Sequence, residues 1–306
     1  MKRMLLGVVI VVAAASACTG GTSTSSNAST RKVIGVTLLT QTHAFYKDLE
    51  AGLRDEAKAK GFDLVVVACE MEPTKQAAQI EDFVAQHVAA IIAAPCDSNA
   101  IVPTLAGPEA AHIPVFTADI AARGGKIVSH VASDNLAGGR LAGEALAAAL
   151  DGKGNVLIIN HPEVASVQDR VKGFEEAIKK YPGIKIVANL SSEGNREKAT
   201  QVMEDMLQAH RDLRGVFGIN DDSALGAAGV IEAAGRKDIA VVGYDASDEA
   251  RAAIKKGGPL KAEVIQYPRK IGQTAIDMVA KYLAGESVPP IVAVEVGIVD
   301  AKNVGK

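Results

Sequence analysis

The chain has 306 residues, of which 48% are hydrophobic and 23% are charged, and its formal net charge is -3. We expect a chain of this length to bury a large core in two lobes, and its weakly acidic balance argues against a nucleic acid partner. Tryptophan is absent and aromatic residues make up only 4%, so any stacking platform for a ring-shaped ligand must come from very few residues.

Residues 1–17 have the organisation of a signal peptide. Lys2-Arg3 precede an apolar run that is too short and wrongly flanked to span a membrane, and small residues lead up to Cys18. The stretch A-S-A-C also resembles a bacterial lipobox, in which Cys18 becomes the lipidated first residue; an ordinary secretory signal with a chance cysteine is the alternative. Residues 18–31 then form a lipidated cysteine and a flexible tether. We therefore predict an exported protein, in the periplasm or on the outer face of the cell membrane, that touches the membrane only through its lipid.

Two further cysteines, Cys69 and Cys96, follow the second and third predicted strands. An exported chain meets an oxidising compartment, where disulfides form. If the two strands flank the first one, they lie about 9.6 Å apart, beyond the usual reach of a disulfide unless the loops lean together. We therefore expect the two thiols to remain unpaired, with a bridge as the alternative.

From residue 32 onward, strand and helix patterns alternate with short connections, which is typical of doubly wound sheets. In the first set we predict strands at 33–38, 62–68, 89–94, 115–117 and 127–131, with helices after the first strand, from Pro73 and from near Ser98. In the second set we predict helices at 135–150, 166–180, 196–209 and 223–234, and strands at 156–159, 185–189, 216–219 and 239–244. A strand at 262–266, a helix at 270–283 and a tail strand at 291–299 end the chain. Two similar halves predict two lobes around a cleft.

Polar side chains follow two neighbouring strands of the second set, at the points where the strands end. Asn220-Asp221-Asp222 come after one buried strand, and Asp245 comes after the next. Open parallel sheets bind their ligands at this edge. Because these groups offer both donors and acceptors, they favour a neutral polyhydroxyl compound, whereas a phosphate would need a glycine-rich turn and positive charge.

The chain carries no recognisable motif for nucleotide binding or hydrolysis. The first β-α turn has no G-x-G-x-x-G pattern, and the glycines at 138, 139 and 143 lie inside a helical run, which indicates close helix packing. The six histidines show no metal-ligand spacing, so we predict no metal and no cofactor. An enzyme would need Asp119, Asp245 or His43 as a general base, and because nothing pairs them at a recognisable spacing we predict no enzyme.

Several motifs, in their order along the chain, resemble those of one protein family. They are F-Y after the first strand, P-C-D-S-N-A, S-H-V-A-S-D-N-x-x-G-G, R-V-K-G-F, N-D-D-S-A-L-G-A and V-V-G-Y-D. Over residues 32–296 the chain resembles the ribose-type (type 1) periplasmic sugar-binding proteins that feed ABC importers. The resemblance implies an α/β fold of two Rossmann-like, doubly wound lobes joined by a three-stranded hinge, with the ligand cleft between them.

The resemblance also implies where the chain passes between the lobes. The crossovers fall near Ser133-Asp134, Gln266 and Gly297. The N-terminal lobe then consists of residues 32–133 plus 267–296, and the C-terminal lobe of residues 134–266 plus 297–306.

By the same resemblance, one set of side chains contacts the ligand. An aromatic pair covers the sugar's C–H surface, carboxylates accept from its hydroxyls, and an arginine donates a forked pair of hydrogen bonds. The residues that match this set are His43, Phe45, Tyr46, Asp119, Arg170, Asn220, Asp245 and Gln266. The alternative places Phe45 in the core stripe of its helix and Tyr46 on the surface, and makes Asp119 and Asp245 helix N-caps.

Five positions depart from the ribose-specific pattern. Leu39, Ala94 and Ile120 stand where that pattern has polar or charged groups, His43 replaces a small amide, and Gly194 takes the place of a stacking aromatic. Such a pocket leaves some ribose hydroxyls unpaired, which is costly in a buried site. We therefore expect a ligand other than ribose: a different pentose, a deoxysugar, a polyol or another small neutral compound.

The motifs together predict the substrate-binding component of an ABC importer. Such a component captures a small neutral sugar or polyol by closure of its lobes and delivers it to the permease subunits in the membrane. We expect a monomer. The alternatives are a sensor that docks on a chemoreceptor or sensor kinase, a regulator of the lactose-repressor type, whose DNA-binding segment would have to stand where the export signal does, and an enzyme.

Overall fold

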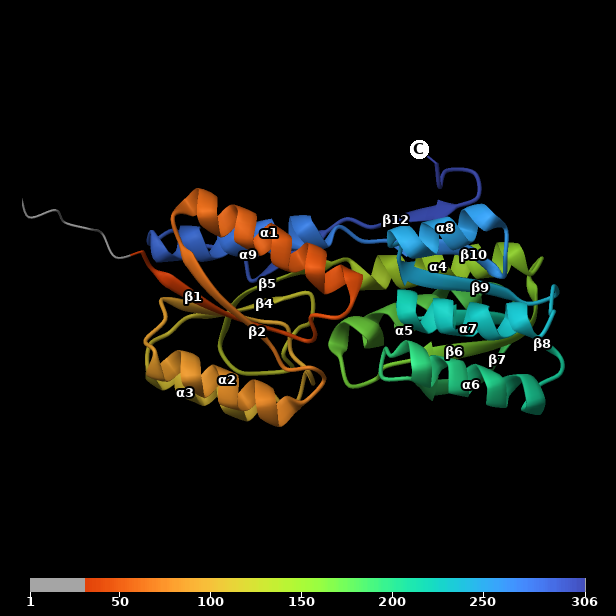
Figure 1. Ribbon diagram of the computed structural model, residues 1–306, viewed down its shortest axis with the longest axis horizontal. Coiled ribbons are helices and arrows are strands. Elements are labelled where there is room, and N and C mark those ends of the chain that lie inside the picture. The colour runs from red at the N-terminus through yellow and green to blue at the C-terminus, as the bar shows by residue number, and fades with distance from the viewer. Residues whose placement is uncertain (1–30, 306) are drawn as a thin grey trace, which may run out of the picture. The chain divides into compact units, whose positions relative to one another are not determined.

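The computed structural model describes residues 31–305, and Figure 1 shows their helices and strands. The predicted signal peptide, Cys18 and the tether as far as residue 30 lie outside the described residues. Among the described helices, none is both long enough and apolar enough to cross a membrane.

The first sheet has six parallel strands in the order β11-β5-β4-β3-β1-β2. Helices α1 and α9 pack together on one face, and α2 and α3 lie on the other (Figure 1). The central strands are buried along their whole length because helices cover both faces. The strands are β1 Val33–Leu38, β2 Asp63–Ala68, β3 Ala90–Ala93, β4 Val115–Ala118, β5 Ile127–Ser133 and β11 Ile291–Val294. The helices are α1 Ala44–Lys60, α2 Pro73–Ala85, the 3-10 turn η1 Val102–Leu105, α3 Ala106–Ala110 and α9 Pro268–Leu283.

The second sheet has the order β12-β10-β9-β8-β6-β7, in which β12 alone runs antiparallel to its neighbour. Helices α4 and α5 pack against each other, as do α6 and α7. The strands are β6 Lys153–Asn160, β7 Gly183–Ser191, β8 Leu213–Gly218, β9 Ala240–Asp245, β10 Leu260–Ile265 and β12 Gly297–Asp300. The helices are α4 Asn135–Ala149, α5 Ala165–Ile178, α6 Arg196–Ala209, α7 Asp221–Ala233 and α8 Asp248–Lys256. The predicted α/β class with two doubly wound lobes is therefore confirmed.

Helices α4 and α5 approach each other through glycines. A Cβ added at Gly139 would lie 2.0 Å from the carbonyl oxygen of Arg170, and one added at Gly173 would lie 2.2 Å from that of Leu136. Neither position has room for a side chain. The prediction of close helix packing is confirmed for Gly139 and for Gly143, which meets Ala177 of α5, whereas Gly138 lies against Tyr244 of β9. The contact between α4 and α5 fixes the backbone of α5 at Arg170, which contributes to the site described below.

The chain passes between the two sheets at three places. It leaves β5 of the first sheet for α4, leaves β10 of the second sheet for α9, and runs from β11 directly into β12. The prediction of a single tail strand at 291–299 is wrong, because Glu295 and Val296 carry the chain from one sheet to the other. Helix α8 is not among the predicted helices, although Ser247 caps its start and Gly257 ends it with φ 84°.

Cys69 and Cys96 form a disulfide, so the expectation that they remain unpaired is wrong. Their Cα atoms are 6.6 Å apart. Strand spacing sets the distance only between residues inside the sheet, whereas Cys69 and Cys96 lie beyond the ends of β2 and β3, where both sulfurs approach the carbonyl of Leu39 after β1. The Cys69 N–H still bonds the carbonyl of Leu38, and the Cys96 N–H bonds the side chain of Gln76, which holds the two loops together.

We expect loss of this disulfide to destabilise the protein. The bridge joins residues separated by 27 positions, and constraining a loop of that length in the unfolded chain is worth about 3–4 kcal/mol in the chain-entropy model. The double variant Cys69→Ala/Cys96→Ala should therefore unfold at lower urea concentration than the oxidised protein, with reduced wild type as the reference. Coincident unfolding curves would show that the bridge adds no stability.

Candidate functional site

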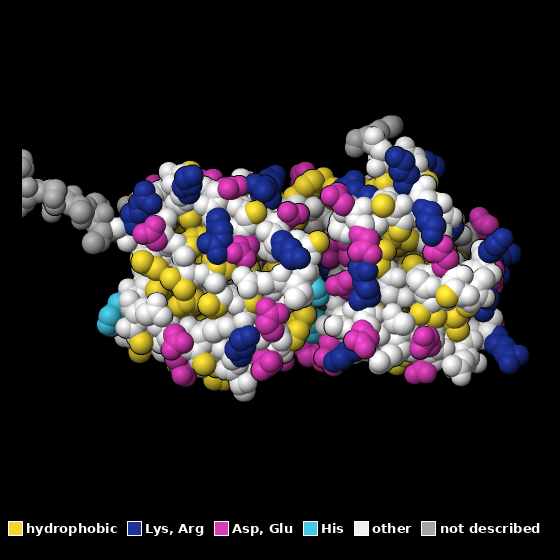
Figure 2. Space-filling model, viewed as in Figure 1, with side chains coloured by type: hydrophobic (Ala, Val, Ile, Leu, Met, Phe, Trp, Pro, Cys, Tyr) yellow, Lys and Arg dark blue, Asp and Glu magenta, His cyan; other side chains and the backbone are white. Residues whose placement is uncertain are grey.

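A cavity lies at the carboxyl ends of strands from both sheets, with about 420 Å³ free of protein atoms, part of it open to solvent. All eight side chains selected from the sequence line it. The other lining residues are Leu39, Met71, Ile120, His161, Val164, Ser166, Val167, Gly194 and Ile219. Figure 2 shows histidine side chains at the boundary between the two halves, with acidic and basic side chains beside them.

Arg170 of α5 brings a buried positive charge to the cavity, with 5% of its surface exposed. Its Nε donates to Oδ1 of Asn135 over 2.9 Å, and its Nη1 donates to the carbonyl of Ile219 over 2.8 Å. The guanidinium lies 3.9 Å from the ring centroid of Tyr244, a cation–π contact, and 3.9 Å from the Asp245 carboxylate. Its Nη2 donates to no atom of residues 31–305, so one arm of the fork remains available to a ligand.

Asp119 follows β4 and has a left-handed backbone, with φ 65°. Its Oδ2 accepts a 2.6 Å hydrogen bond from the hydroxyl of Tyr46, whereas its buried Oδ1 has no partner among the described residues. Burial raises the pKa of Asp119, and the charge of Arg170 opposes this shift. Because the chain continues into β5 and no helix starts at Asp119, the alternative that it is an N-cap is wrong.

Phe45 and Tyr46 begin helix α1 and both face the cavity. Their rings meet edge to face with centroids 5.2 Å apart. Tyr46 is 3% exposed, so the alternative that it lies on the surface is wrong. Phe45 belongs to the hydrophobic core and lines the cavity as well.

Asp245 ends β9 in a strained conformation, with φ 107°. Its Oδ1 accepts a 2.6 Å hydrogen bond from Nε2 of Gln266, whose Oε1 is buried without a partner in residues 31–305. Burial raises the pKa of Asp245 to about 8; the charge of Arg170 opposes this shift and that of Asp221 adds to it. The N-cap of α8 is Ser247, so Asp245 does not cap that helix.

Asn220 is the N-cap of α7. Its Oδ1 accepts from the N–H of Ser223 over 2.9 Å, and its Nδ2 donates to the carbonyl of Gly194 over 2.9 Å. These two bonds fix the amide at the edge of the cavity, where its second N–H remains available.

His161 lines the cavity and was missed by the sequence analysis. It directly follows β6 and is 6% exposed. A Cβ added at Gly194 would lie 3.3 Å from its Nδ1, so the imidazole lies beside the place where the family's aromatic side chain would project. Because His161 occupies a strand end just as Asp119 and Asp245 do, the same positional rule could have found it.

Apolar side chains cover the remaining wall. Leu39 and Ile120 are buried and face the cavity, as the departures from the ribose pattern predict for those two positions. Ala94 is buried as well but lies outside the cavity lining. The cavity lining thus contains both polar and apolar side chains.

Residues 34–287 match the family described as periplasmic binding protein domain. The chain belongs to this family. The ribose import binding protein of Bacillus subtilis is 35% identical over 86% of each chain. The D-apiose import binding protein of Paraburkholderia graminis is 31% identical over 89% of this chain and 88% of its own length. An ABC transporter solute binding protein from Mycobacterium smegmatis, solved with bound glycerol, has a TM-score of 0.86 and 36% identity, over 90% of this chain and 96% of that one.

These matches identify a type 1 periplasmic sugar-binding protein of the ABC importers, as the resemblance implied. They favour the role of a substrate-binding component over that of a sensor. The family serves transporters and is not a family of enzymes, and its periplasmic members are exported.

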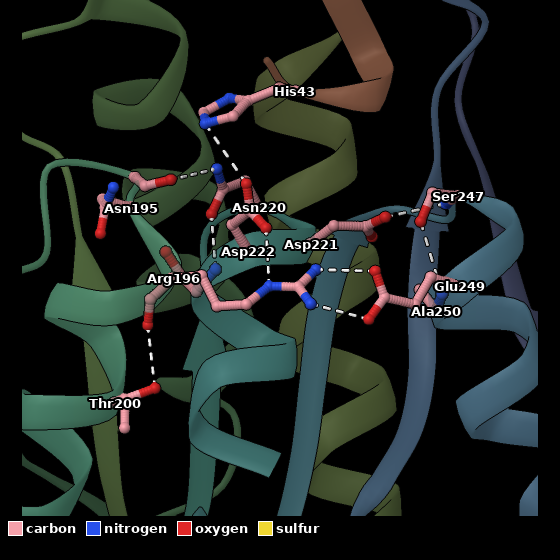
Figure 3. A network of polar contacts seen from close by, with 12 residues as sticks. His43, Asn195, Arg196, Thr200, Asn220, Asp221, Asp222, Ser247, Glu249 and Ala250 are labelled. Atoms are coloured by element: carbon pink, nitrogen blue, oxygen red, sulfur yellow. Dashed lines mark hydrogen bonds and ion pairs between the residues drawn. The ribbon is translucent and has the colours of Figure 1, made fainter. Parts of the chain in front are cut away.

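In this periplasmic binding protein, a polar network joins the two lobes at the rim of the cavity (Figure 3). Nε2 of His43, at the start of α1, lies 3.3 Å from Oδ2 of Asp222, at the start of α7. Asp222 also accepts a 2.9 Å hydrogen bond from Arg196, whose other two nitrogens form a forked pair with Glu249. The lobe of the second sheet therefore places the carboxylate of Asp222, which Arg196 holds, against His43 of the first lobe.

The lobes also touch at a second place. Oγ of Ser98 accepts from the N–H of Ala165 over 2.9 Å, and the Ser98 N–H donates to the carbonyl of Glu163 over 3.1 Å. Arg123 donates to Gln168 over 2.8 Å. Because of the contacts at both places, the two lobes of the binding protein meet around the cavity in this structure.

We expect acid to favour separation of the lobes. Burial lowers the pKa of His43, although Asp222 and Glu70 oppose the shift, so the closed form disfavours the protonated ring. Opening returns the ring to water, where its pKa approaches about 6.5, and the closed form therefore loses stability as pH falls. Small-angle X-ray scattering of the ligand-free protein should give a larger radius of gyration at pH 5 than at pH 7.5.

The variant His43→Gln should show a weaker response to pH, whereas His87→Gln, at an exposed turn after α2, should behave as wild type. If His43→Gln responded to pH as wild type does, protonation of His43 would not control the separation of the lobes.

Proposed function

We propose that this protein captures a small neutral sugar or polyol in the cavity between its lobes and delivers it to the permease subunits of an ABC importer. The observation that carries the proposal is the pair of buried acceptors, Oδ1 of Asp119 and Oε1 of Gln266, that have no donor among the described residues. A buried acceptor without a donor is costly, and ligand hydroxyls supply the missing hydrogen bonds.

Each side of such a ligand meets a matching group. Asp119 and Asp245 accept from hydroxyls, while the free arm of Arg170 and the free N–H of Asn220 donate to hydroxyl oxygens. Phe45 with Tyr46, and the apolar side chains of the lining, cover C–H surface. His43 and Gln266 complete the set at the rim and the hinge. Arg170 compensates for carboxylate charge, which supports a ligand without net charge.

We propose that ribose is not the preferred ligand. Leu39 and Ile120 offer no hydrogen bonds on their side of the cavity, so a hydroxyl facing them would lose its water without a replacement. A pentose of different stereochemistry, a deoxysugar or a polyol can direct its hydroxyls to the polar side chains and C–H groups to Leu39 and Ile120. The glycerol in the Mycobacterium smegmatis relative supports a polyol among these.

The same proposal covers the parts of the chain around the cavity. The N-terminal lobe consists of residues 32–133 plus 267–296, and the C-terminal lobe of residues 134–266 plus 297–306. Residues 1–17 direct export, Cys18 is lipidated, and residues 18–31 tether a monomer to the membrane. The order of the two sheets along the chain supports these lobes.

No covalent chemistry is part of the proposal. Each of the three candidate bases already has one partner: Tyr46 for Asp119, Gln266 for Asp245, and Asp222 for His43. Their remaining hydrogen-bonding positions bind and orient ligand hydroxyls.

Thermal unfolding against a panel of neutral pentoses, hexoses, deoxysugars and polyols should find a selective ligand. A compound at a hundredfold excess over its Kd stabilises the folded state by about 2.7 kcal/mol, which appears as a higher Tm. In Arg170→Ala or Asp245→Ala, the partner charge stays buried and unpaired, so affinity should fall about 30-fold or more.

Arg211→Ala and Asp205→Ala, both exposed on the second lobe, are the matched controls and should bind as wild type. No shift with any compound, together with no small molecule in an extract of the unfolded protein, would overturn the proposed function. D-ribose as the tightest ligand would overturn only the specificity.

Binding near pH 7 should release protons. Burial raises the pKa of Asp245 to about 8 in the empty cavity, and hydroxyls that donate to its carboxylate lower that pKa again. Affinity should therefore rise with pH up to about 8 and then level off. Calorimetry of the selected compound in phosphate and in Tris should give different enthalpies, because the two buffers differ in ionisation enthalpy. Equal enthalpies in both buffers, or an unchanged difference in Asp245→Asn, would contradict this assignment.

A further inference from the structure

Glu263, on β10, is a fully buried carboxyl group outside the cavity lining. It lies over Gly243 of β9: a Cβ added there would be 2.0 Å from Oε1 of Glu263 and 2.6 Å from the Cβ of Ala224 on α7. The carboxyl group thus occupies the layer between the sheet and α7, in space that exists because residue 243 has no side chain. A glutamate in this layer needs a polar partner, since a buried carboxyl without one is costly.

The partner of Glu263 is another acid. Within residues 31–305, no N–H or O–H group donates to either of its oxygens. The carboxyl groups that act on it are those of Asp221 on α7, which is in hydrogen-bonding contact, and Asp245 at the end of β9. Two carboxylates cannot form a hydrogen bond without a proton between them. Burial, first, and then these two negative charges raise the pKa of Glu263 well above its usual value.

The proton resides on Glu263 because Asp221 has other donors. Oδ1 of Asp221 accepts from the N–H of Ala246 over 3.2 Å, and its Oδ2 accepts from the N–H of Ser247 over 3.0 Å. Figure 3 shows Asp221 directed toward Ser247. Two backbone N–H groups stabilise the ionised form of Asp221, whereas for Glu263 the N–H of Ala246 is the weakest of the influences on its pKa.

Asp221 in turn determines the shape of the turn that carries Asp245. The residues at this turn have positive φ, 107° at Asp245 and 59° at Ala246, which L side chains adopt only when their surroundings enforce it. The two N–H groups that Asp221 binds directly follow Asp245, and the Asp221 N–H lies 3.4 Å from Oδ2 of Asp245. A chain of contacts therefore runs from Glu263 through Asp221 to Asp245.

We propose that Glu263 is a positioning residue, a buried carboxylic acid that donates a hydrogen bond to Asp221 and thereby holds Asp245 in its ligand-binding geometry. The proposal rests on the proposed function, since it assigns Asp245 to the ligand. The remaining charged group near this chain is Arg170 on α5, which faces Asp245 from the side of the cavity. The elements packed on β10 are β9, β12, α4, α7 and α8, and of their charged groups Asp221 and Asp245 are those that act on Glu263.

A proton held on buried Glu263 makes the stability of the folded protein depend on pH. The folded protein keeps a proton that the unfolded chain releases above pH about 4.3, so stability falls as pH rises from that value toward the pKa of Glu263 in the folded state. Over this range one proton changes the unfolding equilibrium constant about tenfold per pH unit. Glu263→Gln cannot ionise and still donates an N–H to Asp221.

The test compares wild type, Glu263→Gln and Glu263→Ala as full chains, with the exposed Glu204→Gln on α6 as the matched control. Unfolding in urea at pH 5 and pH 6 should give a ratio of wild-type to Glu263→Gln unfolding constants that rises about tenfold, while Glu204→Gln follows wild type. Hydrogen exchange at the amides of Ala246 and Ser247 should be at least tenfold faster in Glu263→Ala and within threefold of wild type in Glu263→Gln.

Parallel pH profiles for wild type and Glu263→Gln would overturn the assignment of the proton, and unchanged exchange in Glu263→Ala would overturn the positioning role. If Glu263→Ala does not fold, the pH profiles of wild type and Glu263→Gln still test whether Glu263 holds the proton. Neither readout requires a ligand, so failure of the sugar panel would overturn the proposed function and leave this result intact.

Discussion

A buried guanidinium needs acceptors and a countercharge, and Arg170, which is 5% exposed, obtains them for all but its ligand-facing Nη2 from separate parts of the second lobe. Asn135 at the start of α4, the carbonyl of Ile219 after β8, and Asp245 at the end of β9 all meet it, with the ring of Tyr244 beneath. These segments are far apart in sequence, so their meeting requires the sheet order and the close contact of α4 with α5. The geometry of the cavity therefore depends on the packing around this one cation.

Much of this architecture is readable from the sequence. Apolar runs of strand length alternate with amphipathic helices, which leaves few topologies, and the motifs select the family. Two glycines of α4, Gly139 and Gly143, pack against α5 as the sequence predicts. Polar residues at strand ends, such as Asn220 and Asp245, lie at the edge of the cavity because parallel strands bring their carboxyl ends together.

Other features depend on distances that a linear pattern does not contain. The bridge between Cys69 and Cys96 forms because two loops curve over β1, and strand spacing says nothing about loop direction. The apolar pattern at 291–299 is continuous, and although the resemblance implies a crossover near Gly297, only the pairing with two different sheets divides this stretch into β11 and β12. His161 carried no signal beyond its place after a strand, and its closeness to Gly194 exists only once β6 and the loop after β7 are packed.

The unpaired oxygens of Asp119 and Gln266 also affect the equilibrium between the open and closed forms of the empty protein. In the open form water satisfies both, whereas closure around an empty cavity removes that water and leaves them without donors. The substrate, and not the protein, completes the polar network, so an empty receptor has a thermodynamic reason to stay open. A permease that distinguished the closed shape from the open one would then meet mainly loaded receptors in that shape.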